Sequence, residues 1–240
     1  MPAPVEVKTV VEHLGAPGSR KRLTPGAVEN FPGDGMFERL ARVICLANCL
    51  PRKELHEAWE TARRARRRLK GGRVVDLACG HGLLGYVMLL IDDTSPSAIC
   101  VDKRKPASAS TLAAALEAAW PRLQGRVTYI EGKLEDVEIH ASDVVVSAHA
   151  CGGLTDRILD KAMAAGAGVC VLPCCQRVDP HHPLAGWIAP ELAVDIDRAA
   201  RLRAAGYVVR AQSIPVEITP KNRLLIGVPG PVPPVTPPSP

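Results

Sequence analysis

Short apolar runs alternate along most of this chain with longer stretches in which apolar positions recur every three or four residues. The short runs predict β-strands, and the longer stretches predict helices. Strands are expected at 73–78, 98–102, 127–132, 143–148, 168–173, 207–214 and 223–228, and helices at 82–91, 107–119, 154–165 and 191–205. Because the two kinds of element alternate, the pattern predicts an α/β fold with a seven-stranded, mostly parallel sheet and helices on both faces.

The two ends of the chain follow other patterns. Residues 1–35 are rich in Gly and Pro and predict an irregular lead-in, whereas 36–70 predicts two helices that form a small N-terminal helical extension. The strands and helices of the main domain then occupy 71–228, and its last two strands predict an antiparallel pair because no helix separates them. The Pro-rich segment 229–240 predicts a disordered, extended tail.

The first predicted strand leads into the sequence VVDLACGHGLLG, residues 74–85. Gly80 and Gly82 allow a tight turn, and the helix that follows presents free N–H groups to a ligand. Counted from Gly80, the residues match the G-x-G-x-x-G fingerprint of dinucleotide-binding proteins. Asp76, however, would repel a pyrophosphate and would suit a ligand that carries an ammonium group. The stretch therefore points to the amino-acid end of S-adenosylmethionine (SAM).

Residues 76–82, D-x-A-x-G-x-G, resemble motif I of class I SAM-dependent methyltransferases, with alanine in place of the first glycine. The resemblance implies a Rossmann-like fold with SAM as cofactor. It implies that Asp102, at the end of the second strand, binds the ribose hydroxyls and that Leu134 and Glu135 lie along the adenine. Lys133 stands where the family usually has an aspartate. The expected cofactor-binding residues are Asp76, Ala78, Cys79, Gly80, Gly82, Asp102, Leu134, Glu135 and His149.

The segment after the fourth strand, SAHACGGLTD at 147–156, differs from the N/D-P-P-Y/F motif of amino-directed methylases. Together with LPCCQR at 172–177 and EITPKNRLLIG at 217–227, it resembles the methyltransferase-domain subfamily that includes the eukaryotic acceptor-stem tRNA 2′-O-methyltransferases. This resemblance covers residues 36–228 and implies an RNA acceptor, such as a tRNA ribose 2′-hydroxyl.

A 2′-hydroxyl is a weak nucleophile and needs a general base or tight positioning. His149 lies at the right strand end for that base, and Asp156 is a candidate to orient it. The alternatives are that His149 caps the strand or faces SAM, and that Asp156 is an ordinary acid at the start of a helix. Arg177 is a candidate phosphate ligand or an ordinary surface arginine.

The cysteines leave two further chemistries open. Cys151, with Cys174 or Cys175, occupies places comparable to those of the catalytic cysteines in RNA cytosine-C5 methylases. Alternatively, Cys151, Cys174, Cys175, His149, His181 and His182 could converge on zinc. Adjacent cysteines in a strand would point to opposite faces, so no metal site is expected. The catalytic candidates are therefore His149, Cys151 and Asp156.

The net charge of +5 is unevenly distributed, since residues 52–73 hold nine Lys and Arg against three Glu. The basic helix at 52–70 is therefore expected to follow RNA phosphates, with a solvated helix face as the alternative. Aromatic residues make up only 3% of the chain, which leaves open a small-molecule or protein acceptor, or a non-catalytic RNA-binding module. The N-terminus lacks a signal peptide pattern, the cysteines are scattered and no membrane span is expected, so we predict a cytoplasmic protein with no membrane partner.

Overall fold

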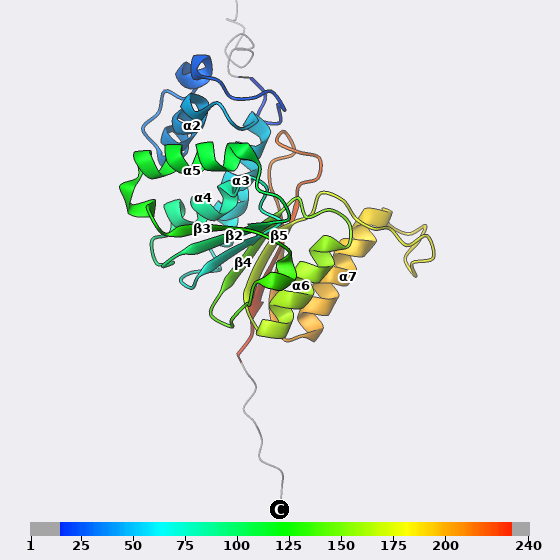
Figure 1. Ribbon diagram of the computed structural model, residues 1–240. Coiled ribbons are helices and arrows are strands. Elements are labelled where there is room, and N and C mark those ends of the chain that lie inside the picture. Colours follow the sequence, from blue (N-terminus) through cyan, green and yellow to red (C-terminus); the bar gives the residue numbers. More distant parts are fainter. Residues whose placement is uncertain (1–14, 232–240) are drawn as a thin grey trace, which may run out of the picture.

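The computed structural model describes residues 15–231, which form a layered α/β structure around one mixed sheet (Figure 1). The strand order is β3-β2-β1-β4-β5-β7-β6, in which β1 to β5 are parallel and β7 runs antiparallel to both of its neighbours. The strands are β1 (Val74–Leu77), β2 (Ala98–Asp102), β3 (Val127–Glu131), β4 (Val144–Ala148), β5 (Gly168–Leu172), β6 (Tyr207–Ser213) and β7 (Arg223–Pro229). The predicted Rossmann-like fold class is confirmed.

Helices cover both faces of the sheet (Figure 1). The α-helices are α2 (Met36–Ala47), α3 (Arg52–Ala65), α4 (Leu83–Ile91), α5 (Ala107–Ala119), α6 (Leu154–Ala165) and α7 (Pro190–Ala204). Short 3-10 helices lie at η2 (Pro25–Asn30), η3 (Pro121–Leu123) and η4 (Leu134–Asp136). Helices α2 to α5 contribute to one hydrophobic core, and α6 and α7 contribute to the other.

The central strands are mainly apolar because both of their faces are covered. Every residue of β1 and β5 is buried. Neighbouring residues of one strand nevertheless enter different cores: Val74 packs under α2 to α5, whereas Val75 packs under α6 and α7. This follows from the alternation of side chains along a strand.

The N-terminal part differs from the prediction in three places. Residues 15–35 are not wholly irregular, because they contain η2 and a β-bridge between Arg22 and Pro51. The first of the two predicted helices, expected over about 36–50, is α2 and ends at Ala47, since Asn48 takes the left-handed conformation that commonly stops a helix. Helix α3 ends at Ala65 instead of residue 70. The predictions for residues 1–14 and 232–240 fall outside the described residues.

The order of the strands fixes where a ligand can bind. The chain leaves β1 toward β2 and β3 on one side, and then returns to place β4 on the other side of β1. Such a switch point opens a crevice at the carboxyl ends of the strands, which is where open α/β sheets bind ligands. Within residues 15–231, no helix combines the length and the apolar character that crossing a membrane requires.

Candidate functional site

A cavity of about 670 Å³ opens at the carboxyl ends of β1, β2 and β4. A second cavity of about 370 Å³ shares Ala78, Asp102 and Leu154 with the first. The other residues of the first cavity that bear on its chemistry are Arg20, Lys53, Glu54, Glu57, Cys79, Gly80, His81, His149 and Cys151. The second is lined by Lys133, Leu134 and Glu135, among others. The expected cofactor-binding residues thus lie around two adjoining cavities, with the exceptions of Asp76 and Gly82.

The turn after β1 carries the two glycines of the motif in different surroundings. Gly80 has a φ of +55°, and no heavy atom of the described residues lies within 4 Å of the position that a Cβ would occupy there. Its N–H donates to Oδ2 of Asp102 at 2.8 Å. Gly82 has a φ of +80° and packs against β2, where a Cβ would lie 3.2 Å from Sγ of Cys100. Gly80 thus keeps one side of the turn open, and Gly82 allows α4 to approach the sheet.

Ala78, which stands where the family has glycine, also has a left-handed backbone, with a φ of +57°. This conformation costs a non-glycine residue about 1–2 kcal/mol, and glycine avoids that cost but loses more entropy on folding. Ala78→Gly is therefore expected to raise the free energy of unfolding by about 0.5–1 kcal/mol, as measured by urea denaturation. The matched control is Ala114→Gly on the exposed face of α5, which should be destabilising by about as much. Destabilisation by both variants would contradict the strain at Ala78.

Asp76 lies beneath this turn and is 1% exposed. Its Oδ2 accepts the N–H of Gly85 at 3.0 Å, whereas Oδ1 has no hydrogen-bond partner among the described residues. Burial raises the pKa of Asp76 to about 8; the Gly85 N–H lowers it and the charge of Asp102 raises it further. The carboxyl is not among the described groups that line the cavities, so its contact with an ammonium group stays a prediction.

The raised pKa of Asp76 makes stability depend on pH. The carboxyl ionises near its ordinary value of 3.8 in the unfolded chain but keeps its proton to about pH 8 when folded. The folded state therefore binds more protons between these values, and stability should fall as the pH rises through that window. Asp76→Asn cannot ionise, so its melting temperature should exceed that of the parent at pH 8, with a difference that shrinks toward pH 5. Asp34→Asn at the exposed surface is the control, and an equal or lower melting temperature for Asp76→Asn at pH 8 would refute the prediction.

His149 meets a carboxylate that the sequence did not suggest. Its Nε2 lies 2.7 Å from Oε2 of Glu57, which is on α3 and 1% exposed. The other oxygen of Glu57 accepts the ammonium group of Lys53. Burial alone would raise the pKa of Glu57, but the hydrogen bonds and charges of His149 and Lys53 hold it below its usual value. An ionised carboxylate therefore holds the imidazole at the wall of the cavity, an arrangement that suits proton transfer.

The expectation that Asp156 orients His149 is wrong. The carboxylate of Asp156 accepts hydrogen bonds from Arg198 at 2.8 and 3.0 Å and from Arg201 at 3.2 Å. Both arginines belong to α7, so the first turn of α6 is directed toward the neighbouring helix. Asp156 joins two helices on the far face of the sheet from α3.

The second cavity receives the residues expected along the adenine. Leu134 is buried at its wall, and Glu135 beside it forms an ion pair with Arg157. The N–H of Lys133 donates to Asp136 at 2.8 Å, so an aspartate three residues later stabilises this turn. Contact between these residues and an adenine ring stays a prediction.

The cysteines are all free thiols. Cys79 and Cys151 line the first cavity, and Cys174 lies beside Cys151. Burial and the two neighbouring thiols raise the pKa of Cys174 to about 12, which is the opposite of what a thiolate nucleophile requires. The raised pKa therefore argues against Cys174 as the nucleophile in the mechanism of the cytosine-C5 methylases.

The basic segment of 52–73 is largely engaged within the fold. Arg66 is buried and donates to Oγ of Ser95 and to backbone carbonyls, and Arg73 pairs with Asp143. Arg63 and Arg64, near the end of α3, both form ion pairs with Glu60. The exposed cations are Arg67, Arg68 and Lys70, which follow the end of α3. Since Glu57 and Lys53 of the same helix line the cavity, these cations lie more than two helical turns away from it.

The chain belongs to a methyltransferase family: a family model described as "Methyltransferase domain" matches residues 53–178, more than half of the chain. A mouse protein, the glutathione S-transferase C-terminal domain-containing protein, is 25% identical over 207 residues, which cover 66% of this chain and 30% of that protein. The chain thus spans about a third of the length of this curated relative.

Solved structures are similar at low identity. An O-methyltransferase family protein from Burkholderia thailandensis is 21% identical, with a TM-score of 0.48 over 92% of this chain and 67% of that one. The B. subtilis tRNA methyltransferase TrmK is 13% identical, with a TM-score of 0.47 over 71% of this chain and 65% of that one.

Proposed function

We propose that this chain is a SAM-dependent methyltransferase that acts on RNA, with a ribose 2′-hydroxyl of tRNA as the first candidate acceptor. The observation that carries the proposal is the buried, ionised Glu57 that holds His149 at the wall of the larger cavity. A hydroxyl acceptor needs a group that removes its proton, and the His149–Glu57 pair can supply that group.

The residues at the switch point fit SAM on three observations. The turn at Gly80 leaves open space beside the backbone, and the buried Oδ1 of Asp76 has no hydrogen-bond partner among the described residues. Asp102 lines both cavities. This position fits a ligand of the ribose hydroxyls, because the ribose of SAM lies between its adenine and its methionine. In this arrangement the adenine would lie against Leu134 and the methionine end near Gly80.

When bound, SAM supplies an electrophilic methyl group. The chain's own residues supply the proton transfer: His149 accepts the proton of the acceptor hydroxyl, and Glu57 stabilises the imidazolium that results. Lys53 keeps Glu57 ionised and in place. Turnover should therefore depend on the His149–Glu57 pair and cofactor affinity on Asp102.

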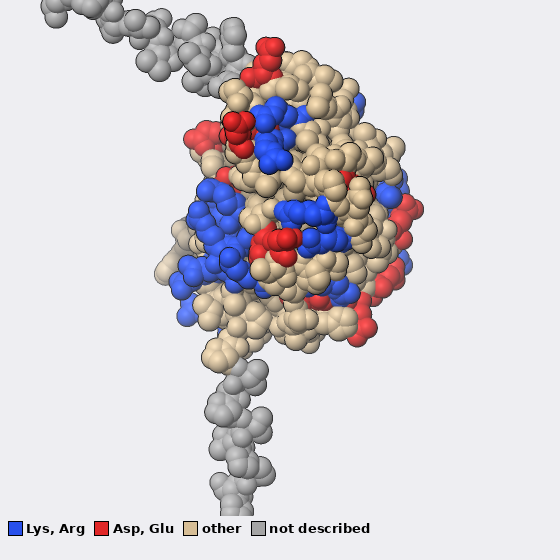
Figure 2. Space-filling model, turned by 90° about the vertical axis from the view of Figure 1, so that its left-hand side faces the viewer, with Lys and Arg blue, Asp and Glu red and all other residues tan. Residues whose placement is uncertain are grey.

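Support for a nucleic-acid acceptor comes from exposed cations near the cavities. Residues 20–22, Arg-Lys-Arg, are exposed, and Arg20 lines the larger cavity. Residues 103–105, Lys-Arg-Lys, are exposed directly after Asp102, and Lys103 lines the smaller one. On the face that Figure 2 shows, Lys and Arg side chains gather in separate groups, one of them extended with few acidic side chains. We propose that the two tripeptides bind phosphates, rather than the helix at 52–70.

The experiment is transfer of labelled methyl from SAM into a fractionated host extract, with Asp102→Ala as the inactive control. Loss of the label after RNase treatment, together with a steep decline of transfer with salt, would support the RNA acceptor. Label that survives RNase and is lost with protease, or that stays in the small-molecule fraction, would overturn it. We expect such an enzyme to work in a reducing, cytoplasmic environment, consistent with its free thiols.

A further inference from the structure

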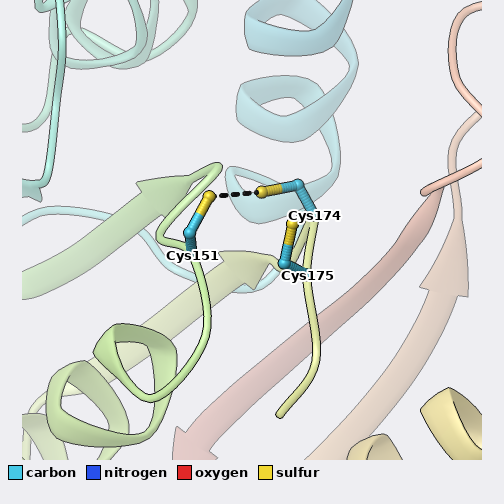
Figure 3. A group of neighbouring side chains, drawn as sticks. All are labelled: Cys151, Cys174 and Cys175. Atoms are coloured by element: carbon cyan, nitrogen blue, oxygen red, sulfur yellow. Dashed lines mark hydrogen bonds between the residues drawn. The ribbon is translucent and has the colours of Figure 1, made fainter.

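Three cysteine thiols converge beside the larger cavity (Figure 3). The sulfur atoms of Cys151, Cys174 and Cys175 all lie within 4.8 Å of one another, and those of Cys151 and Cys174 are 3.2 Å apart. The cluster follows from strand register. Ala148 pairs with Leu172 in the parallel β4 and β5, so residues two or three positions beyond each strand emerge at the same edge.

The adjacent cysteines do not diverge as the strand pattern suggested. Strand β5 ends at Leu172, so Cys174 and Cys175 lie in an irregular segment to which the alternation of strand side chains does not apply. Both side chains can therefore approach Cys151. The three candidate histidines are not part of the cluster: His149 contacts Glu57, His182 contacts Asp197, and His181 is exposed.

We propose that Cys151, Cys174 and Cys175 form a binding site for a thiophilic divalent cation, with Zn²⁺ as the reference ion. A Zn–S bond is about 2.3 Å long, so sulfurs in a tetrahedral site are separated by about 3.8 Å. The sulfurs of Cys151 and Cys174 are 3.2 Å apart and the other two separations do not exceed 4.8 Å, so all three sulfurs lie close to the spacing that a zinc site requires. Three protein ligands leave a fourth position for water or another ligand.

The backbone around the cluster is held in place by bonds that do not involve the thiols. Oγ1 of Thr155 donates to the carbonyl of Ala150 at 2.6 Å, and the buried Arg198 donates to the carbonyl of Gly152 at 3.4 Å. The N–H of His149 donates to Leu172 at 3.0 Å, which ties the turn to the end of β5. These bonds fix the position of Cys151 before any ion binds.

The site is open to solvent and adjoins the cavity. Cys151 and Cys175 are exposed, so an ion can enter without opening the fold. Cys151 also lines the larger cavity together with His149. An ion held by the three thiols would therefore lie next to the candidate acceptor site. The proposal concerns binding and is independent of methyl transfer.

The test uses the full chain, reduced and freed of metal by a chelator, and titrates it with Zn²⁺ and with Co²⁺ as a spectroscopic probe. We expect one equivalent to bind, with a sulfur-to-cobalt charge-transfer band and release of protons. Substitution of a ligand should weaken binding by at least ~100-fold, since even outer partners of metal sites contribute about 10–100-fold. Cys151→Ser, Cys174→Ser and Cys175→Ser are the test variants. Cys49→Ser, a half-buried thiol after α2, is the matched control and should bind as the parent does.

Three results would overturn the proposal. The first is absence of the charge-transfer band in the parent protein, which needs no variant to fold. The second is binding that the three substitutions leave unchanged. The third is a disulfide between Cys151 and Cys174 that persists in mild reductant, seen as an intact mass two hydrogen atoms below that of the fully reduced chain. This result would identify the cluster as a redox pair.

Discussion

Asp102→Ala is expected to weaken the binding of S-adenosylhomocysteine by about 100-fold, measured by isothermal titration calorimetry. The carboxylate lines both cavities and accepts the N–H of Gly80 at 2.8 Å. Each hydrogen bond to a charged group contributes about 1.5–3 kcal/mol, so the loss of two ribose contacts removes about 3 kcal/mol or more. Since 1.4 kcal/mol is a factor of ten, this corresponds to ~100-fold in the dissociation constant.

The same substitution also releases the turn at Gly80, and a second variant separates the two effects. Asp102→Asn keeps an oxygen that can accept the Gly80 N–H but removes the charge, so we expect it to weaken binding by only about tenfold. Asp93→Ala, an exposed carboxylate between α4 and β2, should bind like the parent. If Asp102→Ala binds as tightly as the parent, Asp102 is not the ribose ligand.

His149→Ala should lower turnover by about 10²–10⁴-fold while S-adenosylhomocysteine affinity stays near that of the parent, because it removes the general base and not the cofactor site. Glu57→Gln should lower turnover by a smaller factor, because the imidazolium that forms during proton transfer loses its charged partner. The measurement is the initial rate at saturating SAM, with the acceptor fraction that the labelling experiment identifies.

Glu54→Gln is the matched control for Glu57→Gln. Glu54 lies on the same helix and lines the same cavity, but its partner is His81 at 3.5 Å. A pair this exposed contributes little, so the rate should stay within about twofold of the parent. Parent-like turnover in a folded His149→Ala would remove His149 from the role of base. An equal loss of rate in both glutamate variants would attribute the effect to the charge of the cavity as a whole.

The fold and the turn after β1 were predictable because their signals are local. The central parallel strands are buried on both faces, so they stand out as mainly apolar runs between helical patterns. The turn after β1 is marked by glycines at 80 and 82, where the backbone takes a positive φ. The structure also explains what the pattern left open at residue 78, where an alanine accepts a conformation that glycine would adopt more readily.

The contact between His149 and Glu57 was not predictable, because the two residues are 92 positions apart and only the packing of α3 brings them together. Glu57 lies in a segment whose net charge is strongly positive, and nothing in the sequence distinguishes it from the other two glutamates there. The net charge of the segment also led us to expect exposed arginines, because charge along a sequence does not reveal burial. Arg66 is only 3% exposed and donates hydrogen bonds to the carbonyl of Met88 and to Oγ of Ser95.

The error at Asp156 has a similar origin. An acid in the first turn of a helix is a local feature, but the face it presents depends on which helix packs beside it. Here that helix is α7, and its Arg198 lies 42 residues further along the chain.

Helix α3 shares one hydrophobic core with α4 and the sheet, since Leu55, Ala58 and Ala62 are buried in the same cluster as Val74 and Val146. It cannot swing away from His149 without exposing that core to water. Separation of His149 from Glu57 and global unfolding are thus expected to be one cooperative event. For this protein, activity followed through a denaturant titration would report the stability of the whole domain.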